Sequence, residues 1–158
     1  MTPGDFQEMT GDLWAEHAAG AVVAITTSAA VSKRGRALLL RGCGRQARDR
    51  FPDLPDRLGS LILRYGSHVF ELGNQLVNFP VEIDPFRVPE LRLIEQSCRE
   101  LVLLADEKCW LKIVVPRPGC GGGGLSWKRV KPILGRHFDE RFVVIHHEGA
   151  IDAKSKNR

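Results

Sequence analysis

Glycine is concentrated in one short segment, residues 119–124 (GCGGGG), in which only Cys120 has a side chain. A backbone without Cβ atoms can adopt positive φ and approach a ligand closely, so that several N–H groups point at one anion. The segment follows the apolar run that ends at Pro116 and precedes Ser126, a residue that favours a helix start. A helix N-terminus adds the positive end of its dipole. The pattern predicts a loop that holds a phosphate or diphosphate; a flexible hinge is the alternative.

A second glycine pair occupies the equivalent place after an earlier apolar run. That run ends at Thr26 and Thr27, and Gly42-Cys43-Gly44 opens the next predicted helix. In an open α/β sheet, ligands bind beyond the carboxyl ends of the strands, between loops of this kind. Two such loops could hold one diphosphate from both sides. The alternative is that Gly42 and Gly44 only let the helix pack close to the sheet.

Other nucleotide and metal motifs are not found in the sequence. No Gly-Lys-Ser/Thr follows either glycine group, which disfavours a P-loop, and no acidic residue meets the dinucleotide pattern at the end of a suitable strand. The cysteines lack the CxxC and histidine spacing of a zinc site, so we expect no metal and four reduced thiols. Cys43 and Cys120 belong to the two glycine loops and could face each other.

Strand-like and helix-like stretches alternate along the chain, which is typical of α/β layering. We expect strands at residues 6–9, 21–27, 68–72, 76–81, 110–115 and 142–146. We expect helices at Leu13–Ala18, with Asp12 as a possible N-cap, and at Gly42–Arg50. We expect further helices at residues 58–65, with a start near Pro55-Asp56, and at residues 89–105 and 126–138. Gly73-Asn74 predicts a turn between two antiparallel strands. The prediction is therefore a three-layer α/β/α sandwich with a mixed central sheet.

Length and composition are those of one soluble globular domain. The chain has 158 residues, of which 43% are hydrophobic and 27% charged, and this excludes a disordered chain, a collagen and a small disulfide scaffold. We expect one domain over residues 1–149 and a polar, disordered tail at 150–158. No apolar run reaches the length of a bilayer crossing and no signal peptide is recognisable, so we expect a cytoplasmic monomer without membrane contact.

The net charge of +4 leaves two interpretations open. Lys128, Arg129, Lys131 and Arg136 fall on one predicted helix and could contact a nucleic-acid backbone. A solvated basic helix face is the alternative.

Three groups of residues together resemble the macrodomain-like proteins of bacteria and phages. The first is residues 115–121, 123–127 and 130–134 (VPRPGCG, GGLSW and VKPIL). The second is residues 26–28, 42–47, 49–52 and 54–55 (TTS, GCGRQA, DRFP and LP), and the third is residues 11–13 (GDL). The resemblance extends from about residue 9 to residue 145 and implies a macrodomain-like fold.

Macrodomains bind ADP-ribose, so the resemblance implies that ligand and assigns roles to residues. Asp12 would accept a hydrogen bond from the adenine amino group, and Thr27 would lie near the distal ribose. The two glycine loops would enclose the diphosphate from opposite sides. The full implied site is Asp12, Leu13, Thr26, Thr27, Gly42, Cys43, Gly44, Pro116, Gly119, Cys120, Gly121, Gly122, Gly123, Gly124 and Leu125. His146 or His147 could border the adenine.

The resemblance implies binding of ADP-ribose, free or attached to protein or nucleic acid, without a cofactor. Hydrolysis of attached ADP-ribose is the first alternative. One hydrolase branch uses a Lys and an Asp, whose positions here fall near Val81-Glu82 and on Gly123, so no catalytic residue is assigned and water attack would need help from the ligand's own phosphate. The second alternative is a nucleic-acid-binding module that uses the basic surface.

Overall fold

The computed structural model of the protein describes residues 2–147, so the predicted tail lies outside the described residues. Six strands form one sheet in the order β1-β6-β5-β2-β4-β3. The strands are β1 (Gln7–Gly11), β2 (Val22–Ser28), β3 (Glu71–Gly73), β4 (Leu76–Glu82), β5 (Ile113–Pro116) and β6 (Phe142–His147). The helices are α1 (Leu13–Ala18), α2 (Gly42–Arg50), α3 (Leu54–Tyr65), α4 (Leu91–Lys108) and α5 (Trp127–Gly135).

The sheet is mixed, as the sequence predicts. Strands β1, β6, β5, β2 and β4 run parallel, and only β3 is antiparallel, to β4. The turn between β3 and β4 contains Gly73, Asn74 and Gln75, all with positive φ. Because the five parallel strands point the same way, their carboxyl ends meet along one edge of the sheet.

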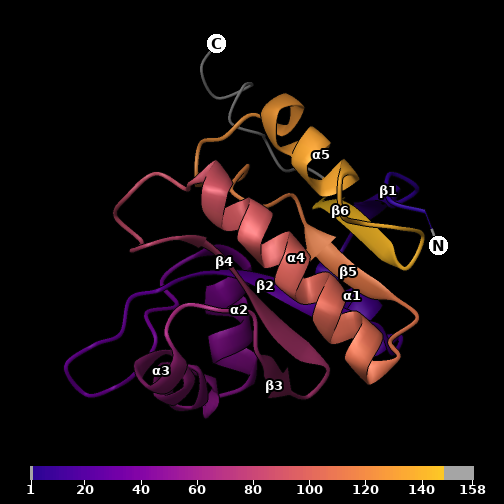
Figure 1. The fold of residues 1–158 in the computed structure, drawn as a ribbon. Coiled ribbons are helices and arrows are strands. Elements are labelled where there is room, and N and C mark those ends of the chain that lie inside the picture. Colours follow the sequence, from indigo (N-terminus) through magenta and orange to yellow (C-terminus); the bar gives the residue numbers. More distant parts are fainter. Residues whose placement is uncertain (1, 148–158) are drawn as a thin grey trace.

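Helices cover both faces of the sheet, which confirms the three-layer sandwich. Along β2, Val22 and Ala24 pack in the core that contains residues of α4 and α5, whereas Val23 and Ile25 pack in the core that contains residues of α1, α2 and α3. Figure 1 shows α4 crossing one face of the sheet, with α2 and α3 on the other side. A strand buried on both faces needs an almost continuous apolar run, and residues 21–27 provide it.

Several element ends differ from the predictions for local reasons. Helix α3 begins at Leu54, beside the predicted start near Pro55-Asp56, because Pro55 is accommodated in the first helical turn. Helix α4 continues to Lys108 and ends where Cys109 adopts a left-handed conformation. Strand β5 begins at Ile113 rather than at 110, and α5 ends at Gly135 rather than at 138.

Strand β3 is shorter than predicted because a side chain replaces part of its pairing with β4. The Asn78 amide nitrogen donates to the His68 carbonyl at 2.8 Å, and its oxygen accepts from the Phe70 amide at 2.7 Å. Residues 68–70 therefore lie beside β4 without forming a regular ladder. Asn78 is 1% exposed, and both ends of its amide group are satisfied.

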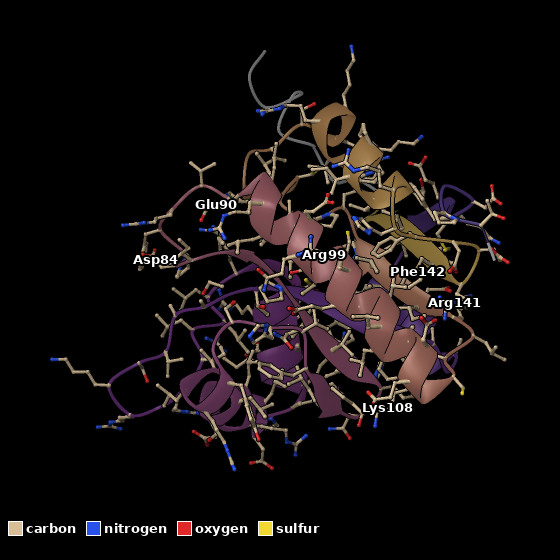
Figure 2. All side chains as sticks on the ribbon, viewed as in Figure 1. Asp84, Glu90, Arg99, Lys108, Arg141 and Phe142 are labelled. Carbon is tan, nitrogen blue, oxygen red and sulfur yellow. The ribbon has the colours of Figure 1, made fainter. Side chains whose placement is uncertain are left out.

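A buried ionic cluster joins the amino-terminal end of β6 to the end of α4. Asp139 accepts hydrogen bonds from the Arg141 amide, Nε and Nη2 at 2.8–3.0 Å, and Arg141 Nη1 donates to Asp106 at 2.7 Å. Burial raises the pKa of Asp139, but these contacts from Arg141 outweigh it and hold the pKa below its ordinary value. In Figure 2, Arg141 and Phe142 lie near the Lys108 end of α4, and Asp84 and Glu90 lie at its other end.

Candidate functional site

A cavity of about 430 Å³ lies at the edge where the parallel strands have their carboxyl ends. Gly11 at the end of β1 and His146 and His147 at the end of β6 line it, as do Pro116 of β5, Thr26–Ser28 of β2 and Glu82 of β4. Because the sheet order is known, the strand ends also give the direction of the cavity. It runs from β1 and β6, past β5 and β2, to β4.

The glycine-rich loop after β5 is closed by its own backbone. The Leu125 amide donates to the Gly119 carbonyl at 2.9 Å. Gly119 has φ +72°, and a Cβ on Gly123 would lie 2.7 Å from the Gly119 carbonyl oxygen and 2.6 Å from Pro89. Side chains at these two positions would disrupt the turn, so glycine is required there for the loop itself.

The middle of the same loop faces the cavity and has room for a ligand. Residues 119–123 line the cavity, and a Cβ on Gly121 would meet no atom within 4 Å. Within residues 2–147, no hydrogen bond uses the backbone N–H groups of Gly122 and Gly123. The loop therefore has unused donors at residues that line the cavity, as an anion-binding loop needs.

The first turn of α2 reaches the cavity from the other side. Arg41 is the N-cap and makes no side-chain capping bond, and residues 42–44 line the cavity. The first N–H groups of a helix have no partner inside the helix, so this turn offers further donors. A Cβ on Gly44 would lie 3.4 Å from the Thr26 carbonyl oxygen, which shows that this glycine also lets α2 pack closely on β2.

The two loop cysteines line the cavity but make separate contacts. Cys43 Sγ accepts from the Thr26 amide at 3.4 Å, and burial raises the pKa of the Cys43 thiol. Cys120 Sγ donates to the Pro118 carbonyl at 3.4 Å. No group of His, Cys, Asp and Glu side chains suited to a metal ion occurs among the described residues.

Two buried polar atoms along the cavity have no hydrogen-bond partner in the described structure. They are Thr27 Oγ1 and His146 Nε2, on β2 and β6. Buried polar groups in proteins are nearly always satisfied, so two exceptions beside one cavity indicate a ligand or ordered water there. Thr27 is 4% exposed, and its hydroxyl is the more deeply buried candidate.

Glu82, one of the acidic residues expected nearest the rim of the site but given no role from the sequence, lines the cavity. It ends β4, its side chain is 10% exposed, and Arg41 Nη2 lies 3.6 Å from Glu82 Oε2. Burial raises the pKa of Glu82; Arg41 opposes this effect and Asp84 adds to it. The available signal was an acidic residue directly after the apolar strand of residues 76–81.

Of the site residues implied by the resemblance, all but three line the cavity. Those that line it are Leu13, Thr26, Thr27, Gly42, Cys43, Gly44, Pro116, Gly119, Cys120, Gly121, Gly122 and Gly123. Asp12 is exposed and caps α1, accepting from the Trp14 amide at 3.1 Å, although its neighbours Gly11 and Leu13 line the cavity. Gly124 lies outside the lining, and Leu125 packs in the core.

The basic helix α5 is partly neutralised by acidic neighbours. Lys131 pairs with Glu8 at 2.6 Å and Arg136 pairs with Glu95 at 2.9 Å. Lys128 and Arg129 are exposed. Two of the four basic residues considered for nucleic-acid contact thus form ion pairs within the protein, which weakens the nucleic-acid interpretation. Among the helices of residues 2–147, none combines the length and apolar composition that a bilayer crossing requires.

Comparison with known proteins shows the fold. No protein-family model and no curated protein matches the sequence. The macrodomain of Mycobacterium tuberculosis DarG superposes with a TM-score of 0.72 at 21% identity, over 90% of this chain and 97% of that chain. The macrodomain of Thermus aquaticus DarG superposes with a TM-score of 0.70 at 20% identity, over 89% of this chain and 97% of that chain. Thermosipho africanus DarTG in complex with ADP-ribose superposes with a TM-score of 0.71 at 16% identity, over 88% of this chain and 41% of that chain. The macrodomain fold inferred from the sequence motifs is confirmed.

Proposed function

We propose that this chain, which has the macrodomain fold, binds ADP-ribose, free or attached to a macromolecule, in the cavity at the carboxyl ends of its parallel strands. The observation that carries the proposal is that two backbone segments suited to donate N–H groups to an anion, the first turn of α2 and Gly122-Gly123, line the same cavity. A structural neighbour from Thermosipho africanus was solved with ADP-ribose, which supports the choice of ligand.

The direction of the cavity suggests how the ligand would lie. The diphosphate belongs in the middle, between the loop after β5 and the first turn of α2. The adenine belongs at the β1 and β6 end, where Leu13 and Ile145 provide apolar contact and His146 a ring. The distal ribose then lies at the β4 end, with Thr27 and Glu82. Arg41 and Arg117 also line the cavity and favour an anionic ligand.

Titration calorimetry with ADP-ribose, AMP and NAD tests this proposal. We expect ADP-ribose to bind more tightly than AMP, because AMP lacks the second phosphate and the distal ribose. NAD carries an additional nicotinamide on the distal ribose, so its affinity reports how much space the β4 end allows. Absence of binding heat with ADP-ribose, confirmed by an unchanged melting temperature, would refute the proposed function.

A glycine variant tests whether the loop contacts the ligand. In Gly121→Val the new side chain has space in the free protein, so the fold should be retained. We expect it to occupy the diphosphate position and to weaken ADP-ribose binding by about tenfold or more, equivalent to about 1.4 kcal/mol. Gly135→Val is the control, because a Cβ there would only approach Phe6 at 4.0 Å, away from the cavity lining. Equal affinities in the two variants would contradict the proposed position of the diphosphate.

One observation favours a second candidate function, hydrolysis of the bond that joins the distal ribose to a macromolecule. The β4 end of the cavity contains a buried carboxyl group, Glu82. Carboxyl groups are common acid–base groups in enzymes. Release of ADP-ribose from an ADP-ribosylated protein or oligonucleotide would demonstrate this activity.

A further inference from the structure

The fold does not explain why Glu82 is buried. Within the described part of the chain, its carboxylate makes one ion pair, with Arg41 at 3.6 Å, and no hydrogen bond. A buried carboxylate is costly unless it is paired and hydrogen-bonded. Asp139, which is similarly buried, accepts three hydrogen bonds from Arg141. Glu82 is therefore the buried carboxylate whose oxygens remain available to a ligand.

The position of Glu82 selects one part of the proposed ligand. Strands β1 and β6 end at the adenine end of the cavity, and β4 lies on the far side of β2 from them. Glu82 thus lies at the distal-ribose end, in an inference that rests on the proposed function. Val81, Pro85 and Pro89 line the same end, so its surroundings are largely apolar.

Arg41 connects Glu82 with the proposed diphosphate position. Its guanidinium pairs with Glu82, and a Cβ on Gly122 would lie 3.7 Å from Arg41 Nε. Arg41 therefore lies between the carboxylate and the glycine loop. Its side chain is 51% exposed, so it can change partners at little cost. A diphosphate in the loop offers a guanidinium a doubly charged, bidentate partner.

We propose that Glu82 is the general base of this cavity, and that binding of the diphosphate draws Arg41 away from Glu82 and so makes it a stronger base. In the step, a water oxygen attacks the anomeric carbon of the distal ribose while Glu82 takes one proton from that water. The bond from the anomeric carbon to the linking atom of the macromolecule breaks, and the linking atom keeps the electron pair. Glu82 then gives its proton to the linking atom, which leaves ADP-ribose and the unmodified macromolecule.

The charges around Glu82 agree with the proposed increase in its basicity on binding. Burial raises its pKa, the Arg41 charge opposes that effect, and the Asp84 charge adds to it. Loss of Arg41 to the diphosphate removes the opposing charge, and the anionic ligand adds a further charge of the same sign as Asp84. The other titratable side chains along the cavity are Cys43, Arg117, Cys120, His146 and His147.

The catalytic part of the proposal is tested with Glu82→Gln, and with Glu107→Gln as the matched control on the exposed end of α4. Substrates are an ADP-ribosylated protein, an ADP-ribosylated oligonucleotide and ADP-ribose linked through its distal ribose to 4-nitrophenol. We expect Glu82→Gln to lower kcat by about 100-fold or more with ADP-ribose affinity within about threefold of wild type, and Glu107→Gln to change neither. The acidic limb of the pH–rate profile should disappear in Glu82→Gln, and Glu82→Asp should restore part of the rate.

Proton uptake tests the role of Arg41 without any cleavage. ADP-ribose titrations in two buffers of different ionisation enthalpy, repeated across a range of pH, should show that wild type takes up protons on binding and that Glu82→Gln takes up fewer. Equal uptake in the two proteins would overturn the link between Arg41 and Glu82. Equal cleavage rates, or cleavage of none of the substrates by wild type, would overturn the catalytic assignment. If ADP-ribose binds but neither effect is found, the proposed function stands and this inference fails.

Discussion

The two ends of the sheet each contain a buried carboxylate and an arginine, yet they use them differently. At the amino-terminal end of β6, Asp139 accepts three hydrogen bonds from Arg141, which also contacts Asp106. At the carboxyl-terminal end of β4, Glu82 makes a single long ion pair within residues 2–147, with Arg41. The difference separates a carboxylate that holds elements together from one that the fold leaves available.

The same contrast appears in the pKa values. Burial raises the pKa of both carboxyl groups. Hydrogen bonds from Arg141 reverse this effect for Asp139, whereas the charge of Arg41 does not reverse it for Glu82. Among the described residues, the unsatisfied hydroxyl of Thr27 and ring nitrogen of His146 line the same cavity as Glu82. Unsatisfied polar groups therefore occur together at one end of the sheet, as expected for a binding site rather than a core.

Removing Arg141 should have the largest effect on stability. Arg141→Ala leaves Asp139 buried without its partner, so we expect a loss of about 3–5 kcal/mol in the free energy of unfolding, measured by urea denaturation at pH 7. Arg129→Ala, an exposed arginine on α5, is the control and should stay within about 0.5 kcal/mol of wild type. A loss below about 1 kcal/mol would show that the cluster is not a structural support.

Neutralising the two carboxylates should change stability with opposite pH dependence. The raised pKa of Glu82 contributes stability below its ordinary value of 4.5 that is lost as pH rises, so Glu82→Gln should be as stable as wild type or up to about 1 kcal/mol more stable above pH 7. The lowered pKa of Asp139 contributes stability above its ordinary value of 3.8 that is lost as pH falls. Asp139→Asn should therefore be most destabilising near neutral pH and least so in acid. If the free energies of unfolding of the two variants, relative to wild type, changed with pH in the same direction, the contrast between Glu82 and Asp139 would be refuted.

The smallest expected change is the loss of the Thr27 hydroxyl. Thr27→Val removes a buried oxygen that has no partner, so stability should be unchanged or rise by about 1 kcal/mol. ADP-ribose affinity should fall by about fivefold, as loss of one neutral hydrogen bond implies. Thr10→Val on β1, at an exposed position outside the cavity lining, is the matched control. Unchanged affinity in Thr27→Val would show that the hydroxyl does not contact ADP-ribose and bonds a buried water instead.

The architecture could be predicted because its signals are local. An apolar, β-branched run identifies β2, and the turn at Gly73-Asn74 requires an antiparallel strand. The glycine loop is also local, since its glycines are needed by backbone conformation and by close approach within the loop. The start of α3 could be predicted because proline favours a first helical turn. The end of β3 depends on hydrogen bonds from the Asn78 side chain, which a periodicity analysis does not include.

The chemistry of the site could be predicted only in part, because it depends on contacts between distant residues. Asp139 has its arginine two residues away, but residue spacing alone does not distinguish it from Glu82. Glu82 meets Arg41 only because α2 begins beside the end of β4. Whether a carboxylate is buried, and with which partner, is set by tertiary packing and is not visible in residue spacing.

Asn78 also affects how the molecule behaves toward copies of itself. Strand β3 is an edge strand of the sheet, and the unpaired backbone groups of an edge strand can pair with a strand of another chain and start aggregation. The regular ladder at this edge is only three residues long, because residues 68–70 are held to β4 by the Asn78 side chain and not by a regular ladder. A neighbouring chain therefore finds a short template there, so one buried amide helps to protect the protein from edge-to-edge association at high concentration.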